Sequence, residues 1–235
     1  MRHPITKFAV AATIILAAVA VFRVFHETSG VAWAIEQSIQ ALGQYRAVVV
    51  EGSDTQRRWE ANGSLEPQPT KMWAVANGDQ TRVEKFRYEV NGAATLVTDG
   101  RQTWRYDPQT NTVRIENRPY VASECWFGPL LEQLKKAREA GIVTDWKETT
   151  GPDPATGRPR IFLACAWQDR RWNGPRSMRF EFDRETKLPV RFQQWENATW
   201  EGPAALTVDS ISFYESLPDE LFEFQIPPGA TVVGQ

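Results

Sequence analysis

Histidine is almost missing from this sequence of 235 residues, and the two that occur, His3 and His26, both lie near its beginning. The rest of the chain therefore lacks the usual general base of Ser-His-Asp and Cys-His nucleophile systems. It also lacks the commonest nitrogen ligand of zinc and non-haem iron sites. We expect no metal, no other cofactor and no enzymatic turnover.

Phosphate-binding loops and basic runs are absent too. Neither G-x-x-x-x-G-K-[ST] nor G-x-G-x-x-G occurs, and the formal net charge is -2, which gives no electrostatic reason to expect nucleic acid. Acidic residues are plentiful, so a carboxylate pair such as Glu181 and Asp183 can be chosen. Because a glycosidase needs such a pair at a fixed separation in a cleft, a carboxylate enzyme is kept only as an alternative to solvated strand faces.

Cysteine is scarce, with only Cys125 and Cys165 present. A disulfide between them would close a loop of about 40 residues and contribute ~3–4 kcal/mol in the chain-entropy model. The alternative is two buried thiols, with Cys165 in a strand and Cys125 at the entry to a helix.

The N-terminal segment is apolar. Residues 8–25 carry one charge, Arg23, and would extend ~27 Å as a helix, close to the thickness of a thin hydrocarbon core. Arg2 and Lys7 favour an orientation with the N-terminus inside. We therefore expect residues 1–28 to be an uncleaved membrane anchor with a short linker, and residues 29–235 to lie in the periplasm.

A cleaved signal peptide is the alternative. The A-x-A sequence at residues 32–34 lies far beyond the apolar core, and cleavage there would cut into the next helix. No cysteine lies near this segment, so a lipid anchor is excluded.

Aromatic residues are abundant, with 10 Trp and 12 Phe. They fit either a large β-sandwich or barrel core or an apolar cavity or interface, and the count alone does not separate the two.

Two segments have helical spacing. Residues 31–42 carry one apolar stripe, with Ser29 as a candidate N-cap and Gly43 at the end. The second helix runs from Phe127 to Ala140 and ends at Gly141.

Most other segments alternate apolar and polar residues, which predicts strands. The expected strands are 45–52, 56–65, 72–76, 81–90, 94–98, 101–106, 112–116, 142–148, 161–167, 176–183, 189–195 and 206–214, with a short extended segment at 224–226.

One turn pattern occurs three times, beginning at Asp107, Asp153 and Asp183. In each, an Asp opens the turn, a Thr stands fourth, and the fifth residue is Asn, Gly or Lys, which is consistent with a left-handed residue that closes a hairpin. The three turns predict an antiparallel meander.

Two motifs resemble a known family. They are FEFDRETKLPVRFQQW at residues 180–195 and PDELFEFQIPPG at residues 218–229. They are similar to the "D-x-x-T-x-L-P" hairpin and "D-x-x-F-x-F-x-x-P-x-G" ending of the outer-membrane lipoprotein carriers (LolA/LolB-like). The resemblance implies a mainly β (α+β) fold, an incomplete antiparallel β-barrel or curved sheet whose concave apolar face is covered by helices and can hold acyl chains.

The same fold is used by RseB-like periplasmic sensor domains. We therefore expect a single-pass protein of the bacterial inner membrane whose LolA-like domain, residues 29–235, binds lipid or lipoprotein acyl chains. The alternative is a regulatory module of an anti-sigma or envelope-stress system that binds a partner protein. The candidate groove residues are Trp73, Trp104, Trp126, Phe127, Leu130, Leu134, Phe180, Phe182 and Phe192.

The second helix is the expected lid of this groove. Its apolar stripe is Leu130, Leu131, Leu134 and Ala137, and its charged residues face the other way. A plain core helix has the same pattern, so stability and ligand binding must be measured together to separate the two.

Overall fold

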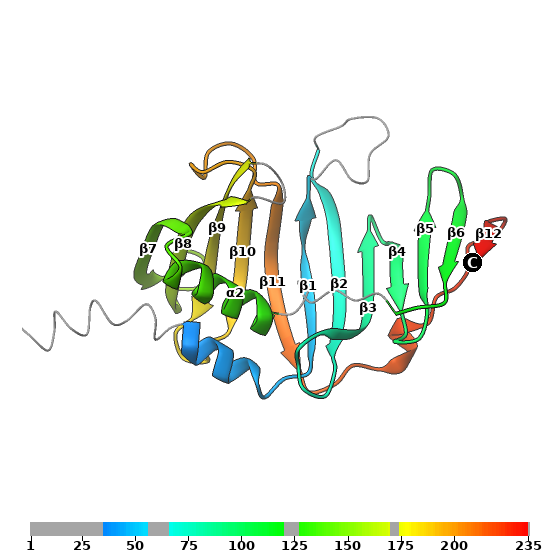
Figure 1. The fold of residues 1–235 in the computed structure, drawn as a ribbon, viewed down its shortest axis with the longest axis horizontal. Coiled ribbons are helices and arrows are strands. Elements are labelled where there is room, and N and C mark those ends of the chain that lie inside the picture. Colours follow the sequence, from blue (N-terminus) through cyan, green and yellow to red (C-terminus); the bar gives the residue numbers. More distant parts are fainter. Residues whose placement is uncertain (1–34, 56–65, 120–126, 170–173, 235) are drawn as a thin grey trace, which may run out of the picture.

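The structure is a computed structural model that describes residues 35–55, 66–119, 127–169 and 174–234. These residues are mostly β and form one open sheet of twelve strands with two α-helices (Figure 1). The predicted anchor, the predicted strand at 56–65, Cys125 and Trp126 lie outside the described residues. Within the described ranges, no helix is both long enough and apolar enough to cross a bilayer.

The strands largely match the alternating segments of the sequence. They are β1 (Ala47–Asp54), β2 (Gln68–Ala76), β3 (Val83–Val90), β4 (Ala93–Thr98), β5 (Thr103–Asp107), β6 (Thr112–Glu116), β7 (Val143–Pro152), β8 (Pro159–Asp169), β9 (Gly174–Asp183), β10 (Pro189–Trp195), β11 (Leu206–Tyr214) and β12 (Thr231–Gly234). The helices are an N-terminal helix whose described part is residues 35–42, α2 (Phe127–Glu139) and the 3-10 helix η3 (Asp219–Phe222).

The strand order is β12-β6-β5-β4-β3-β2-β1-β11-β10-β9-β8-β7. The predicted antiparallel meander is confirmed for β1 to β6 and for β7 to β11, and β1 joins the two halves by pairing with β11. The expectation is wrong for β12, which pairs parallel with β6. A four-residue strand that is exposed along its whole length gives no alternating pattern by which to find it.

The three repeated turns are formed as the sequence predicts. Each opening carboxylate accepts the backbone N–H two residues on, at 2.8–3.0 Å. Each fifth residue has a left-handed backbone, with φ of 46° at Asn111, 68° at Gly157 and 65° at Lys187. These turns fix the β5–β6, β7–β8 and β9–β10 hairpins.

The two helices pack on one face of the sheet, which we call the helix face. Figure 1 shows both helices over the β7–β11 half of the sheet. Leu131 and Leu134 of α2 enter one apolar core with Ile35 of the N-terminal helix and with strand residues such as Leu163 and Phe180. The predicted second helix is confirmed; it ends at Glu139, and Gly141, two residues on, has a left-handed backbone with φ of 68°.

The C-terminal segment packs on the opposite face, near β3 to β5. Phe222 of η3 is buried, and Phe224 stacks on Trp104 with ring centroids 6.2 Å apart. Arg87 of β3 donates to the carbonyl of Leu221 at 3.3 Å. This segment follows β11 across the sheet and ends in β12.

Candidate functional site

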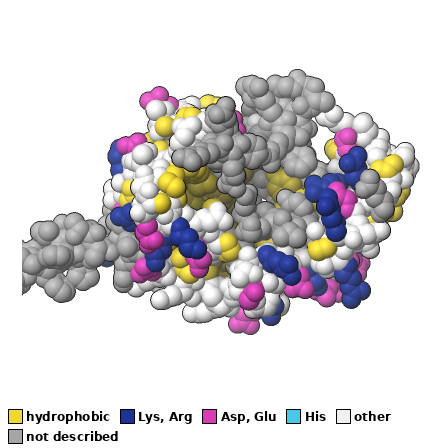
Figure 2. Space-filling model, in the orientation of Figure 1, with side chains coloured by type: hydrophobic (Ala, Val, Ile, Leu, Met, Phe, Trp, Pro, Cys, Tyr) yellow, Lys and Arg dark blue, Asp and Glu magenta, His cyan; other side chains and the backbone are white. Residues whose placement is uncertain are grey.

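A groove of about 190 Å³ lies on the helix face, between α2 and the middle of the sheet. Seven of its ten lining residues are aliphatic or Phe side chains. The lining residues are Val50, Asp54, Thr70, Met72, Tyr88, Phe127, Leu130, Phe192, Leu206 and Val208. Figure 2 shows hydrophobic side chains gathered in a hollow near the middle of this face.

Phe127, at the start of α2, fixes one wall of the groove. Its ring meets Phe192 of β10 and Phe213 of β11 edge-on, at centroid distances of 6.1 and 5.8 Å. Edge-to-face contacts of this kind hold aromatic rings in a preferred geometry. The beginning of α2 is therefore anchored to the sheet beside the groove.

Neighbouring leucines of α2 have different surroundings. Leu131 is fully buried in the core, whereas Leu130 is half-buried and lines the groove. The helix therefore serves both as a core element and as a wall of the groove, and the two leucines separate these roles.

The groove has a polar part at the ends of β1 and β3. The hydroxyl of Tyr88 lies 3.5 Å from Oδ2 of Asp54, and Thr70 lies in the same lining. An apolar pocket with a few polar groups is typical of sites that bind small or amphiphilic ligands.

The structure brings three of the predicted site residues together at this groove: Phe127, Leu130 and Phe192. Leu134, Phe180 and Phe182 are buried in the core of the helix face and do not line it.

The two predicted tryptophans lie on the opposite face. Trp73 follows Met72 in β2 and therefore points away from the groove, where Lys71 and Arg87 lie over its ring. Trp104 stacks on Phe224 of the C-terminal segment. Trp126 lies outside the described residues.

Sequence reasoning missed much of the groove's wall, including Val50, Met72, Tyr88, Leu206 and Val208. Alternation separates the two faces of each strand but does not say which face the helix covers. Alternation therefore gives no reason to prefer Met72 over Trp73, although these neighbours point to opposite faces of β2.

Cys165 is a buried thiol in β8, and burial raises its pKa to about 12. The choice between a disulfide with Cys125 and two buried thiols stays open, because Cys125 lies outside the described residues.

Glu148 of β7 is half-buried on the helix face, opposite Leu163 of β8. Burial raises the pKa of its carboxyl group, and the charge of Arg138 in α2 partly opposes this. Arg138 also lies over the ring of Trp146, at 4.4 Å.

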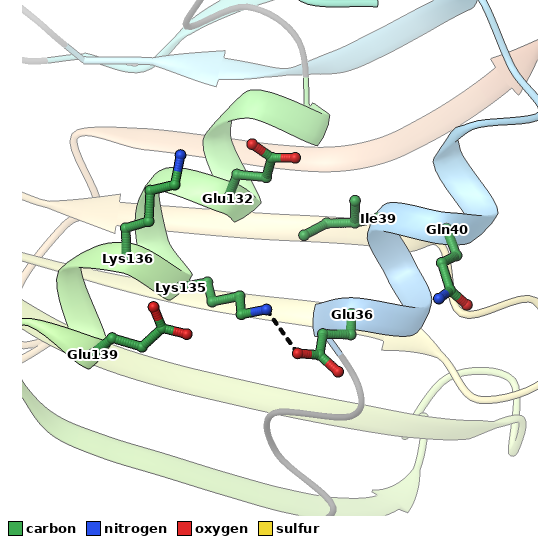
Figure 3. Close-up of a pocket in the computed structure, with 7 residues that line it drawn as sticks. All are labelled: Glu36, Ile39, Gln40, Glu132, Lys135, Lys136 and Glu139. Carbon is green, nitrogen blue, oxygen red and sulfur yellow. Dashed lines mark hydrogen bonds and ion pairs between the residues drawn. The ribbon is translucent and has the colours of Figure 1, made fainter.

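A second groove, about 490 Å³ in volume, lies between the N-terminal helix and α2 (Figure 3). Its residues are mostly charged, and Lys135 pairs with Glu36 at 2.7 Å across it. This hydrogen bond raises the pKa of Lys135. The groove is polar and solvated, in contrast to the apolar groove beside it.

A third cavity, about 240 Å³, lies on the opposite face, among polar and charged residues of β9, β10 and β11 such as Arg179 and Arg191. Among the described residues, no group of three His, Cys, Asp or Glu side chains is arranged to hold a metal ion.

No family model matches the chain, and no curated protein matches it. The solved structures that are similar to it include the following two. One is MucB in complex with MucA(peri), with 19% identity over 86% of this chain and a TM-score of 0.43. The other is a chain of the Pseudomonas aeruginosa MucA/MucB complex, with 18% identity over 85% of this chain and a TM-score of 0.42. The chain spans 61% and 62% of the lengths of these two chains.

Proposed function

We propose that this chain binds the apolar part of a lipid or lipoprotein in the groove between α2 and the sheet. The observation that carries the proposal is the groove itself, about 190 Å³ lined mainly by aliphatic and Phe side chains. An apolar cavity of about 150 Å³ is large enough to bind a ligand of the size of benzene. The groove thus has room for part of an acyl chain.

The arrangement of α2 supports the same function. Phe127 and Leu131 hold the helix on the sheet through buried contacts, so the wall that Leu130 forms is kept in place without a ligand. Sites that bind small molecules are usually apolar and largely pre-formed in this way.

The test uses N-phenyl-1-naphthylamine, an uncharged probe that fluoresces in apolar sites. We expect saturable binding by the full chain and at least fivefold weaker binding by Leu130→Trp, whose indole would occupy the groove. The control is Ile142→Trp, because Ile142 is an exposed apolar residue outside the groove. Equal binding by both variants, or no saturable binding by the wild type, would overturn the proposal.

A regulatory module that binds a partner protein is the second candidate function, and the edge strand β12 favours it. All four residues of β12 are exposed, and none of them is charged or proline. Such an edge can accept a strand from another protein. One of the similar solved structures is MucB in complex with MucA(peri). The second candidate function likewise assigns a protein partner to the present chain.

The second candidate is tested by photo-crosslinking in cells. A crosslinker at Val233 of β12 should capture a discrete partner that a crosslinker at Thr149, on the opposite edge strand β7, does not capture. Equal labelling at both positions would exclude a role for β12.

We further propose that residues 1–28 tether the domain to the bacterial inner membrane, with the domain in the periplasm. The apolar segment and the early charges Arg2 and Lys7 support this orientation. N-terminal sequencing of the mature protein should find the segment intact. A mature chain that starts at Ile35 would show a cleaved signal peptide instead.

A further inference from the structure

The cavity on the face opposite the helices is surrounded by polar side chains. Phe192 and Val208 also border it, but their side chains line the apolar groove on the helix face. Because neighbours along a strand point to opposite faces, the residues on either side of these two point to the cavity. The six side chains that face the cavity are Arg179, Glu181, Arg191, Gln193, Thr207 and Asp209.

The strand registers arrange these residues in two rows. Arg179 of β9 lies directly opposite Gln193 of β10, which lies directly opposite Thr207 of β11. Since neighbouring strands are about 4.8 Å apart, this row spans about 10 Å. Glu181 and Arg191 face each other two residues along, about 7 Å away. The volume of about 240 Å³ is below the ~300–1,000 Å³ of sites for drug-sized molecules, so it suits a smaller ligand.

A β-bulge places Asp209 beside the cavity. Val208 and Ser210 pair with consecutive residues of β1, so Asp209 between them is the extra residue of the bulge. The strands approach so closely here that a Cβ atom at Gly52 of β1 would lie 1.9 Å from the carbonyl oxygen of Thr207. Glycine in a strand often marks such a close approach of two backbones. The position of Asp209 therefore depends on a specific feature of the sequence.

The charged residues of the cavity balance one another. Two arginines stand against two carboxylates, so the lining has no net charge. Nη1 of Arg191 lies 3.8 Å from Oε2 of Glu181, and Nε of Arg191 donates to the carbonyl of Asp209 at 3.1 Å. Arg179 lies over the ring of Trp195, at 5.7 Å. An anion at Arg179 would be repelled by Glu181, two residues along β9, and the arrangement therefore favours a neutral ligand.

Much of the hydrogen-bonding capacity of the cavity is unused. Oε2 of Glu181 is buried and has no hydrogen-bond partner. The side chains of Arg179, Gln193, Thr207 and Asp209 make no hydrogen bond or ion pair with other described residues. Arginine only donates and a carboxylate only accepts, whereas an amide and a hydroxyl group do both. A ligand with several hydroxyl groups, each a donor and an acceptor, satisfies all of these side chains together.

We propose that this cavity binds one ring of a neutral saccharide through its hydroxyl groups. Gln193 lies in the middle of the site, with Arg179 and Thr207 on its two sides and Asp209 at the bulge. The site lies on the other side of the sheet from the apolar groove, so the inference goes beyond the proposed function and does not depend on it.

The test uses three neutral trisaccharides, maltotriose, chitotriose and mannotriose, which present their hydroxyl groups in different arrangements. Calorimetric titration of the full chain should show saturable binding of at least one of them. Because the ligand is uncharged, high salt should change its affinity less than twofold. Triglycine, a zwitterion of similar length, should not bind.

Two variants locate the binding. Thr207→Val removes only a hydroxyl group and should weaken the saccharide about fivefold, and Gln193→Ala, which removes an amide with two functions, should weaken it about tenfold. The matched control is Thr149→Val, at an exposed threonine of β7 on the same face, which should leave the affinity unchanged. Both cavity variants should keep the wild-type denaturant midpoint and the binding of N-phenyl-1-naphthylamine, because neither side chain supports the core or the groove.

The outcomes separate this inference from the proposed function. If none of the three trisaccharides binds saturably while N-phenyl-1-naphthylamine does, the saccharide site fails and the apolar groove stands. If Thr207→Val and Gln193→Ala bind a trisaccharide as tightly as Thr149→Val does, the sugar binds elsewhere and the inference is overturned. Binding of triglycine in place of the trisaccharides would show a site for zwitterions and would overturn it as well.

Discussion

Glu148 shows how the surroundings of a single residue make stability depend on pH. It lies half-buried between β7 and α2, where burial raises the pKa of its carboxyl group. A raised pKa means that the folded state binds the proton more tightly than the unfolded state does. The ionised form therefore lowers stability at pH values above the folded pKa. This loss of stability decreases as the pH falls through the folded pKa, and it is gone below the pKa of the unfolded state.

We expect Glu148→Gln to raise the denaturant midpoint at pH 8, because glutamine carries no charge to be desolvated. The difference from the wild type should shrink as the pH falls and vanish below the ordinary glutamate pKa, about 4.3. Denaturant unfolding between pH 8 and pH 4 measures this. Glu185→Gln, in an exposed turn, serves as the control, and a less stable Glu148→Gln variant at pH 8 would contradict the argument.

Arg160 is a second residue whose burial matters. Its guanidinium is mostly buried and pairs with Asp153, at 3.4 Å, and with Asp183. These are the opening residues of two of the repeated turns, so one arginine connects the β7–β8 and β9–β10 hairpins.

Replacing Arg160 with leucine should therefore destabilise the protein, because it leaves the buried Asp153 with only the more distant Arg191, at 3.8 Å, as an ionic partner. Removal of one partner from a buried ion pair costs ~3–5 kcal/mol. Chemical denaturation at pH 7 measures the loss, and Arg158→Leu, in the exposed part of the turn, should cost little. A similar loss in both variants would show that the pairing of Arg160 is not responsible.

At the scale of the element, α2 has a buried side and a side that lines the groove. Leu131→Ala should lower the free energy of unfolding by ~2–5 kcal/mol, because it removes a fully buried side chain and leaves a cavity. Leu130→Ala should cost less, because the groove already lacks atoms on one side of that residue.

The same two variants should differ in ligand binding, with Leu130→Ala weakening the uncharged probe more than Leu131→Ala does. Denaturant unfolding and probe titration of both variants measure the two effects. If Leu130→Ala is as costly as Leu131→Ala and leaves binding unchanged, α2 is a core helix and not a wall of a binding site.

The sequence predicts elements well and their partners poorly. Alternation locates the long strands, and the Asp-opened turns join them into hairpins, because both signals are local. The pairing of β1 with β11, by contrast, depends on which distant strand fits, and no local residue specifies it. The same limit placed Trp73 and Trp104 at the site, since only the observed pairing and packing show which face of each strand the helix covers.

At the scale of the whole molecule, the C-terminal segment connects β11 and β12, which are far apart in the strand order of the sheet. It leaves β11 in the middle of the sheet, buries Phe222 on the opposite face and adds β12 beside β6 at one edge. The segment therefore contributes to the stability of strands formed by the first half of the chain.

Phe222→Ala should lower the free energy of unfolding by ~3–5 kcal/mol, because its ring is fully buried. Val232→Ala, on the exposed strand β12, should change it by no more than ~0.5 kcal/mol. Thermal and denaturant unfolding of both variants measures the difference. Equal, small effects would mean that the segment is only loosely attached.

The pairing of β1 with β11 has a consequence for how the chain is made. Ala47 lies opposite Tyr214, 167 positions later in the chain, so one edge of β1 stays without its partner until that distant segment has left the ribosome. Through that interval β1 presents unpaired backbone and the apolar run from Val48 to Val50 to its surroundings. Such an edge is a template for association between nascent chains, and this strand is where a chaperone that shields the newborn protein would be most needed.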